Sequence, residues 1–236
     1  RNPIQPRRVP KASLSDHAPT ATDRRLIDKA LARLDWIAGL NMGSIGVPTG
    51  EADGLTIDTI NMLFAITRGP MPPRLAETIH RAIPKPVILI HADEDGGAAS
   101  LSLAPKRAAE REAGRVVTMQ VHDSGPLSDA EAEFTATLAL SGLPTRDLAA
   151  LYGGLIERVE ALEAARTGGR VFRLATSLDE AAEWQGALKR QSELKNSLAA
   201  QIALAKKETR LARRVELGEK AARIRKEIEA VTRRLI

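Results

Sequence analysis

The last quarter of the chain, residues 178–236, has a composition that favours helix throughout. It contains no proline and two glycines, and it is built mainly from residues that lose little on entering a helix. Toward the C-terminus its apolar residues recur in alternating steps of four and three, which is a heptad pattern. The pattern consists of Leu217, Ala221, Ile224, Ile228, Val231 and Leu235. This segment therefore predicts a coiled-coil helix whose apolar stripe faces another helix.

Two architectures remain open for this segment, because its apolar residues form two stripes that are out of phase. It is either one helix of about 85 Å, at ~1.5 Å per residue, or two helices that fold back near Glu208. In both cases the stripe is an interaction surface. A homodimer formed through the C-terminal helix would be the commonest assembly. The upstream stripe consists of Leu194, Leu198, Ile202 and Ala205.

The basic residues are unevenly distributed. Residues 1–177 hold 21 basic and 21 acidic residues, whereas residues 178–236 hold 14 and 9 and so carry the whole net charge of +5. A basic helix can track nucleic-acid phosphates, complement an acidic protein partner, or form an ordinary solvated coiled-coil exterior. The candidate nucleic-acid or partner contacts are Arg7, Arg8 and Lys11 in a proline-rich N-terminal arm, and Lys206, Lys207, Arg210, Arg213 and Arg214.

The chain has no cysteine, which excludes disulfides and thiolate metal sites and is typical of a reducing cytoplasm. No apolar run approaches the ~20 residues of a membrane span. Phosphate-binding glycine motifs are also missing. We therefore expect a cytoplasmic protein that carries no cofactor and does not insert into a membrane.

The first 125 residues alternate between helix and strand patterns. Thr20 to Ala38 has a continuous apolar face at helical spacing, and the glycine-rich residues 39–54 follow as a loop. The next elements expected are a strand over 55–67, a helix over 74–83 and a buried strand over 84–92, with shorter strands at 98–103 and 116–121. This order predicts a small sheet with helices on one face.

Helix dominates beyond residue 126. Ser128 and Glu131 have the spacing of a capping box, and Thr145 is the expected cap of the next helix. We therefore predict an α+β protein. Its parts are a small α/β domain with a short mixed sheet and a basic arm over 1–125, a helical pair over 126–177, and a basic coiled-coil helix or helical hairpin over 178–236.

Three groups of residues are candidates for chemistry. Residues 91–97 are rich in ligands for a hard cation such as Mg²⁺, although acidic residues before Gly-Gly also suit a hairpin turn. A metal-dependent nuclease could use Asp58 and Asp93–Asp95, but no Glu-x-Lys or Asp-x-Lys follows on an expected strand. His122 and Asp123 could hold a general base, yet a surface hydrogen bond is the commoner role. We therefore predict no catalytic residues and no metal site.

Four segments, residues 8–41, 79–90, 142–162 and 206–231, resemble the bacterial family of domain of unknown function 4391 (DUF4391). The similarity covers most of the chain. Its more specific parts are Val9-Pro10-Lys11 followed by Leu31, Leu34 and Trp36, and the stretch from Lys207 to Leu217. Members of this family look to be encoded beside Snf2-type helicases and DNA methyltransferases in restriction-like, phage-defence clusters. The resemblance implies a partner subunit of a DNA-acting complex, without catalytic residues that could be transferred.

We therefore expect a non-catalytic accessory subunit of a bacterial anti-phage complex. It would dock on a Snf2-type helicase or a DNA methyltransferase and contact DNA through the basic C-terminal helix. One alternative is a cryptic or degenerate metal-dependent nuclease, which Mg²⁺-dependent cleavage would reveal. The other is a stand-alone DNA-binding coiled-coil protein, whose binding would be salt-sensitive and lost without residues 178–236.

Overall fold

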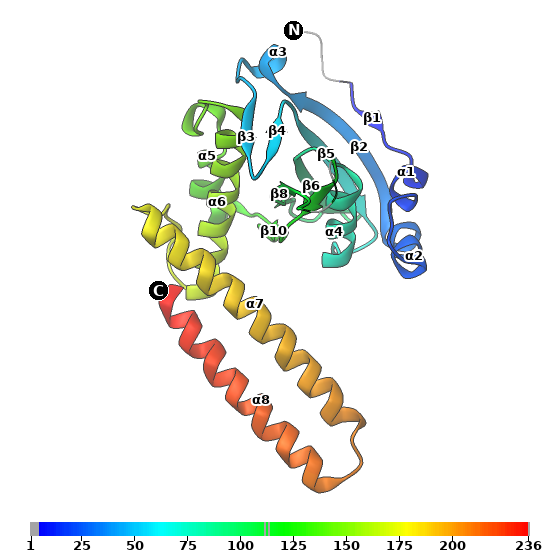
Figure 1. The fold of residues 1–236 in the computed structure, drawn as a ribbon, viewed down its shortest axis with the longest axis vertical. Coiled ribbons are helices and arrows are strands. Elements are labelled where there is room, and N and C mark those ends of the chain that lie inside the picture. The colour runs from blue at the N-terminus through cyan, green and yellow to red at the C-terminus, as the bar shows by residue number, and fades with distance from the viewer. Residues whose placement is uncertain (1–4, 111, 113, 236) are drawn as a thin grey trace. The chain divides into compact units, whose positions relative to one another are not determined.

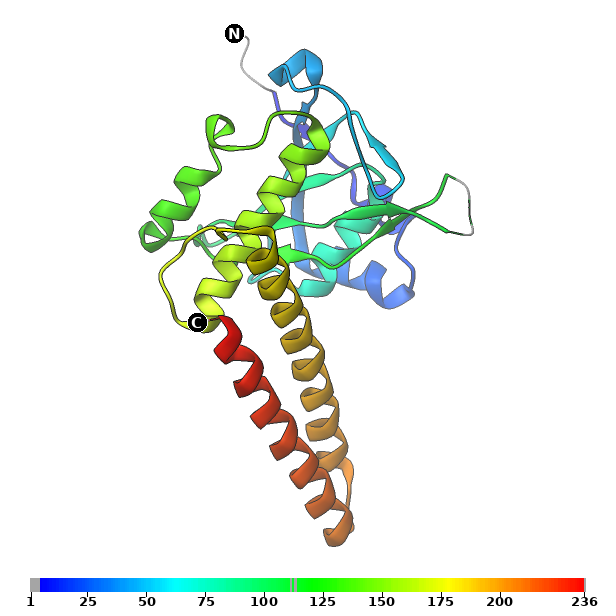
Figure 2. The ribbon, with the colours of Figure 1, turned by 60° about the vertical axis from the view of Figure 1, so that its left-hand side comes forward.

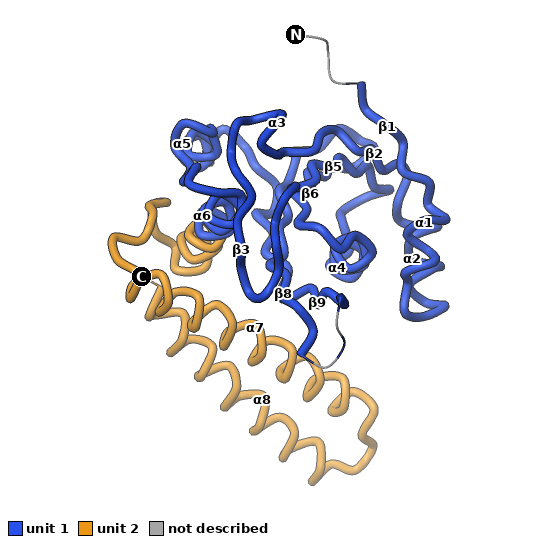
Figure 3. Tube along the Cα trace, turned by 45° about the horizontal axis from the view of Figure 1, so that its top comes forward, with its two compact units in different colours: residues 1–159 blue, residues 160–236 orange. Residues whose placement is uncertain are grey.

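The computed structural model describes residues 5–110, 112 and 114–235. The chain divides into two compact units, Arg1–Val159 and Glu160–Ile236, which Figure 3 shows in blue and orange. The first unit is built on a mixed sheet and the second is helical, which confirms the predicted α+β class. The domain boundaries expected at residues 125 and 177 stay predictions.

The first unit contains a six-stranded sheet with the strand order β1-β2-β5-β6-β7-β10. β5 and β6 are parallel, and the other neighbouring strands are antiparallel. Figure 1 shows β2 as the long blue strand on the N-terminal side of this sheet. The strands are β1 (Arg7–Arg8), β2 (Leu31–Leu40), β5 (Ile60–Thr67), β6 (Val87–Asp93), β7 (Ser100–Leu103) and β10 (His122–Asp123).

Two short hairpins accompany the main sheet. One pairs β3 (Gly50–Ala52) with β4 (Leu55–Ile57), and the other pairs β8 (Lys106–Ala108) with β9 (Val116–Thr118). The loop predicted over residues 39–54 was therefore partly wrong. Asp53 and Gly54 both have positive φ, 49° and 74°, as a tight Asp-Gly turn requires.

Helices cover both faces of the sheet. α1, α2 and α4 supply Leu14, Ile27 and Leu75 to the main core, together with Leu63 and Leu89 of the sheet. α6 lies on the opposite face (Figures 1 and 2). There the Tyr152 hydroxyl donates a hydrogen bond to Val87 O at 2.9 Å. The helices of this unit are α1 (Lys11–Ser15), α2 (Ala21–Ala30), α3 (Met42–Ile45), α4 (Pro73–Ala82), α5 (Ala132–Thr137) and the start of α6 (Leu148–Gly168).

The predicted helix from Thr20 to Ala38 is wrong beyond residue 30, because β2 begins at Leu31. Two irregularities in the β2–β5 register explain the error. The first shifts the pairing so that Leu31 and Leu34, three residues apart, lie opposite Thr67 and Ala65 on one face of β5. A bulge of this kind places residues at helical spacing on the same side of a strand. The apolar pattern therefore imitated a helix.

The helix caps agree with the sequence in one case and differ in another. Ser128 and Glu131 form the expected capping box, at the start of a 3₁₀ turn that leads into α5. Thr145 does not cap α6. Instead, Asp147 Oδ1 accepts a hydrogen bond from the Ala150 amide at 2.8 Å, so the cap lies two residues later than predicted.

The second unit is a helical hairpin with a small core at one end. α7 (Leu178–Lys207) and α8 (Leu211–Thr232) are joined by a three-residue turn at Glu208–Arg210, so of the two open architectures the hairpin is the observed one (Figures 1 and 2). A 3₁₀ turn follows α8 at Arg233–Leu235. Near the open end, the end of α6 packs with both helices, through Ala161, Ala164, Trp184, Ala187, Leu188 and Leu235.

Candidate functional site

The five basic residues predicted to contact nucleic acid or a partner lie together at the turn of the α7–α8 hairpin. They are Lys206, Lys207, Arg210, Arg213 and Arg214, and all five are exposed. We call this set the hairpin tip. Glu208 is the only acidic residue between positions 206 and 214. The tip is therefore a compact cationic surface made by two chain segments.

The ion pairs of the hairpin tip leave three cations available. Arg210 pairs with Glu208 at 3.2 Å and Arg213 pairs with Glu216 at 2.5 Å. Lys206, Lys207 and Arg214 make no ion pair with the described part of the chain. Surface ion pairs of this kind contribute little to stability. These side chains are therefore free to meet an anionic ligand.

Helix electrostatics distinguishes the two sides of the tip. Lysines in the last turn of α7 suit the negative end of its dipole. α8 has the opposite arrangement, because it begins with Arg210 at an N-cap without a side-chain hydrogen bond and has no acidic residue in its first turn. Arg213 and Arg214 follow at the positive end of the dipole, where cations are unfavourable. Stability alone does not account for this choice of residues.

Apolar side chains are also exposed next to the hairpin tip. Leu204, Leu211 and Val215 are 53%, 72% and 54% exposed. A groove of about 420 Å³ runs beside the tip, where Ala205, Gly218 and other small residues leave space between the helices. The tip therefore combines charge with apolar surface, as interaction surfaces often do.

The heptad stripe of α8 faces the chain's own α7. Leu217, Ala221 and Leu235 are buried, and Ile224, Ile228 and Val231 are half-buried. The pairing is fixed at its edges by Gln191, whose Nε2 donates to Thr232 Oγ1 at 2.8 Å, and by an Arg190–Glu227 ion pair at 3.2 Å. The partner helix that the stripe requires is therefore supplied within one chain.

The basic residues of the N-terminal arm lie in the first unit and have structural contacts. Arg7 and Arg8 form β1, an edge strand that pairs with β2, and Lys11 begins α1, so the described part of the arm is not an unpacked tail. The Arg7 guanidinium lies 5.8 Å from the centre of the Trp36 ring. Lys11 Nζ donates to Leu31 O at the end of α2. Residues 1–4 of the predicted arm lie outside the described residues.

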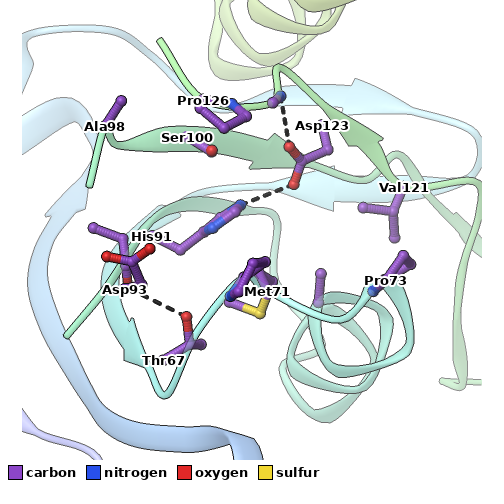
Figure 4. A pocket seen from close by; sticks show the side chains of 14 residues that line it. Thr67, Met71, Pro73, His91, Asp93, Ala98, Ser100, Val121, Asp123 and Pro126 are labelled. Carbon is purple, nitrogen blue, oxygen red and sulfur yellow. Dashed lines mark hydrogen bonds and ion pairs between the residues drawn. The ribbon is translucent and has the colours of Figure 1, made fainter. Parts of the chain in front are cut away.

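A pocket of about 450 Å³ lies in the first unit, where the parallel strands β5 and β6 end (Figure 4). In α/β sheets the carboxyl ends of parallel strands are the usual place for a ligand. Thr67 and Asp93 are the last residues of the two strands. The remaining lining residues include Pro70, Met71, Pro73, His91, Ser100, Val121, Asp123 and Pro126. We call this cavity the sheet-end pocket.

His91 and Asp123 form a hydrogen-bonded polar pair in the sheet-end pocket. His91 Nε2 lies 2.8 Å from Asp123 Oδ2, and Figure 4 shows the imidazole directed at this carboxylate. The other oxygen, Asp123 Oδ1, accepts a hydrogen bond from the Gly125 amide at 2.7 Å. His91 is 7% exposed. The carboxylate is therefore held by the backbone and in turn orients the imidazole.

Further buried polar groups surround this pair. His80 of α4 makes a hydrogen bond with Ser102 of β7 at 2.9 Å. Burial, followed by the charge of Lys106, lowers the pKa of His80 to about 3, and burial lowers the pKa of His122 to about 4. Lys106 Nζ donates to His80 O and to Ile83 O, both at 2.6 Å, at the C-terminal end of α4, and burial lowers its pKa to about 8. The β6–β7–β10 part of the sheet is thus unusually polar for a protein interior.

The acidic segment after β6 forms a turn, as the alternative reading of the sequence held. Asp93 Oδ1 accepts a hydrogen bond from the Gly97 amide at 2.9 Å, and Gly96 has a φ of 77°. Among the described residues, no three His, Asp or Glu side chains are grouped so that they could hold a metal ion.

The acids of the nuclease alternative are far apart. Asp58 precedes β5 and pairs with Lys85 at 2.6 Å, at the amino ends of β5 and β6, and this hydrogen bond lowers the pKa of Asp58. Asp93 ends β6, six residues beyond Val87, which is about 20 Å at ~3.3 Å per residue. The suggestion that Asp58 and Asp93–Asp95 act together is therefore wrong.

The sequence contained the parts of the sheet-end pocket but not their combination. The sequence groups His91 with the acidic residues that follow it, and it groups Asp123 with the adjacent His122. The structure pairs His91 with Asp123, while His122 lies opposite Leu103 in the ladder. A period-two reading of residues 98–103 predicts β7, but the register that places Ser100 opposite His91 is a tertiary property.

Comparisons with known proteins give one match. No curated protein and no solved structure is similar to this chain. Across the described residues, the helices lack any stretch with the length and hydropathy that a membrane span requires. The model of one family, the domain of unknown function DUF4391, matches residues 4–228 of the 236-residue chain. This protein therefore belongs to the DUF4391 family.

Proposed function

We propose that this protein is a cytoplasmic accessory subunit of a bacterial DNA-acting defence complex. It docks on a Snf2-type helicase or a DNA methyltransferase, and its hairpin tip contacts the phosphates of DNA. The observation that carries the proposal is the start of α8. There, Arg210 occupies the N-cap without making a capping hydrogen bond, and Arg213 and Arg214 follow in the first turn. Cations are unfavourable at this end of a helix.

A phosphate ligand would account for this arrangement. Lys206, Lys207 and Arg214 have no acidic partner among the described residues, so an approaching anion does not have to displace one. Cations on a protein surface bind DNA largely by releasing its condensed counterions. An unfavourable local charge in the free protein then becomes favourable in the complex.

Salt-dependent DNA binding tests the role of the tip. Duplex binding by the purified chain is measured by fluorescence anisotropy between ~50 and 200 mM salt, where affinity through phosphate contacts falls steeply. Replacing Lys206, Lys207 and Arg214 with Gln should reduce the slope of log K against log[salt] by about 2 to 3, because each lost phosphate contact reduces it by about 0.9.

The matched control changes Lys220, Arg223 and Lys226 to Gln. These residues are also exposed cations of α8 that make no ion pair with the described residues, so the change in net charge is the same. The control variant should keep the wild-type slope. An equal reduction of the salt slope in both variants would mean that only the overall charge matters. An unchanged slope in the tip variant would exclude the tip as the DNA contact.

Affinity purification tests the partner. The tagged full chain is recovered from its native cells, with the lysate treated with nuclease so that shared DNA does not link the proteins. A helicase or a methyltransferase should co-purify with the wild type and with the tip variant. If neither enzyme is recovered, the subunit proposal fails. DNA binding by the isolated protein would then favour the stand-alone alternative.

A further inference from the structure

The strongest unassigned feature is a buried serine beside the His91–Asp123 pair. Ser100 and His91 are directly opposite each other in the antiparallel β6–β7 ladder. Side chains at opposite positions lie on the same face of a sheet, with Cβ atoms about 4.5–5.5 Å apart. Both residues line the sheet-end pocket, and they are 5% and 7% exposed. The sheet therefore holds the two side chains together at the pocket wall.

The Ser100 hydroxyl and one imidazole nitrogen of His91 have no hydrogen-bond partner among the described residues. Ser100 Oγ makes no hydrogen bond to the described part of the chain, and neither does His91 Nδ1. His91 Nε2 is engaged by Asp123. Because a carboxylate only accepts hydrogen bonds, this contact keeps the proton of a neutral imidazole on Nε2 and leaves a lone pair on Nδ1. His91 is thus oriented as a base.

Asp123 reaches His91 from the far side of β7. The strand order is β6-β7-β10, and Asp123 of β10 lies opposite Ser102 of β7. The His91 side chain therefore extends across β7, the strand that carries Ser100. Figure 4 shows that Ser100 lines the same pocket as the imidazole of His91 and the carboxylate of Asp123. A serine can change among three staggered rotamers about χ1 without any movement of the backbone.

We propose that Ser100, His91 and Asp123 form a hydrolytic site for esters or amides. In the first step Ser100 Oγ attacks the acyl carbon and its proton passes to His91 Nδ1. The bond from the acyl carbon to the leaving oxygen or nitrogen breaks, and the leaving alcohol or amine takes that proton. Water then attacks the acyl-serine, His91 accepts its proton, and the carboxylic acid leaves as Ser100 regains the proton.

The lining of the pocket selects the class of substrate. Asp93 and Asp123 contribute negative charge, and no Lys or Arg among the described residues lines the cavity. Pro72 and Pro73 at the start of α4 have no amide hydrogen, so this helix end offers few donors to an anion. Pro70, Met71 and Val121 give apolar walls. The site therefore suits an uncharged or cationic acyl compound, and its 450 Å³ is the size of a small-molecule pocket.

This site goes beyond the proposed accessory role and does not depend on it. All three residues belong to the first unit, whereas the hairpin tip belongs to the second. An accessory subunit with this site would contribute hydrolysis in addition to binding. Failure to recover a helicase or a methyltransferase would not affect the proposed hydrolytic site. Failure to label Ser100 would not affect the proposed subunit role.

An uncharged alkyl fluorophosphonate tests the nucleophile on the full chain. Attack by an activated serine forms a bond from Oγ to phosphorus and releases fluoride. Peptide mass spectrometry should find the label on Ser100 of the wild type, and Ser100→Ala should abolish it. Ser102→Ala is the matched control, because Ser102 is buried on the same face of β7 but its Oγ is hydrogen-bonded to His80. This control should be labelled at the wild-type rate.

The base and its orienting carboxylate are tested by His91→Gln and Asp123→Asn, which preserve approximate size. Loss of a general base costs about 10²- to 10⁴-fold in rate. His91→Gln should therefore slow labelling by at least about 100-fold. Asp123→Asn should also slow labelling and change its pH profile. An unlabelled Ser100 in the wild-type chain, or an unchanged labelling rate in His91→Gln, would overturn the proposal.

Discussion

At the scale of single residues, the first unit buries polar side chains at a cost in stability. The interior near β7 holds His80, His91, Ser100, Ser102 and His122, each less than a tenth exposed. Polar groups taken from water cost free energy unless they are hydrogen-bonded, and a half-satisfied network is worse than an apolar one. Sequences tend to keep such costs at functional sites. These buried polar side chains therefore support a chemical role for the sheet-end pocket.

The two histidines with lowered pKa values predict acid sensitivity. In the folded state His80 and His122 stay neutral down to about pH 3 and 4, whereas in the unfolded chain they bind protons below about pH 6.5. The unfolded state thus binds more protons between these values, so stability is fully present above pH 6.5 and falls with the pH. From pH 7 to pH 5 we expect a loss of about 2 kcal/mol for each histidine, measured by urea unfolding.

Variants identify the source of this pH dependence. His122→Asn should reduce the loss between pH 7 and pH 5 by about half, because one of the two titrating groups is removed. His17→Gln controls for the substitution itself, since His17 is exposed. A wild-type protein with the same free energy of unfolding at both pH values would contradict the prediction.

At the scale of elements, the two long helices of the hairpin begin differently. Ser177 caps α7 by accepting a hydrogen bond from the Glu180 amide at 3.1 Å. α8 begins with Arg210, which provides no such bond. Ser at an N-cap is worth about 1 kcal/mol relative to a residue that cannot cap. The start of α8 is therefore less stable than the same fold permits.

Arg210→Ser should increase stability and weaken DNA binding. The new hydroxyl can cap α8, which should raise the free energy of unfolding by about 1 kcal/mol. The lost cation should reduce the salt slope of DNA binding by about 1. Urea unfolding and fluorescence anisotropy measure the two effects. Ser177→Arg is the reverse substitution at α7 and should destabilise the protein. An Arg210→Ser variant that gains both stability and DNA affinity would contradict the prediction.

Two adjacent glycines of α6 give a prediction with opposite signs. A Cβ added at Gly153 meets no atom within 4 Å, whereas one at Gly154 would lie 2.6 Å from Pro144 Cδ. Gly153→Ala should therefore stabilise the protein by about 0.5–1 kcal/mol, because alanine loses less entropy in a helix. Gly154→Ala should destabilise it by about 1–3 kcal/mol through overpacking against a rigid ring.

Urea unfolding of the two alanine variants tests this difference, and each variant controls for the other. Both sites lie in the same helix and receive the same methyl group. A shift of equal sign in both would mean that α6 does not approach Pro144 as closely as the structure has it.

The sequence predicted elements well where local spacing was decisive and failed where pairing was decisive. α4, β6 and the capping box at Ser128 follow from turn residues and apolar runs. The spacing of Leu31 and Leu34 predicts a helix, whereas a bulge in β2 places both residues on one face of a strand. The nuclease alternative, which combines Asp58 with Asp93–Asp95, also fails on strand pairing, because the parallel register of β5 and β6 places these acids at opposite ends of the two strands.

At the scale of the whole molecule, the two proposed functions lie in different compact units. The hairpin tip is in unit 160–236 and the sheet-end pocket is in unit 1–159. The two sites have no residue in common. Substitutions at sites without shared partners usually have additive effects.

We therefore expect the two sets of variants to act independently. The tip variant with Lys206, Lys207 and Arg214 changed to Gln should lose DNA affinity and keep fluorophosphonate labelling of Ser100 unchanged. Ser100→Ala should do the opposite. A double mutant should show both single effects without further loss. Reduced labelling in the tip variant would contradict independence and would indicate coupling between the units.

The sequence by itself determined the α+β class, the helical C-terminal quarter and the cationic residues at its centre. These properties follow from propensity, heptad spacing and charge, which are local. Tertiary structure decided that the apolar stripe of α8 would be covered by α7 and that residues 206–214 would become a hairpin tip. It also brought together His91, Ser100 and Asp123 from three strands, because strand register depends on long-range hydrogen bonds that no local pattern specifies.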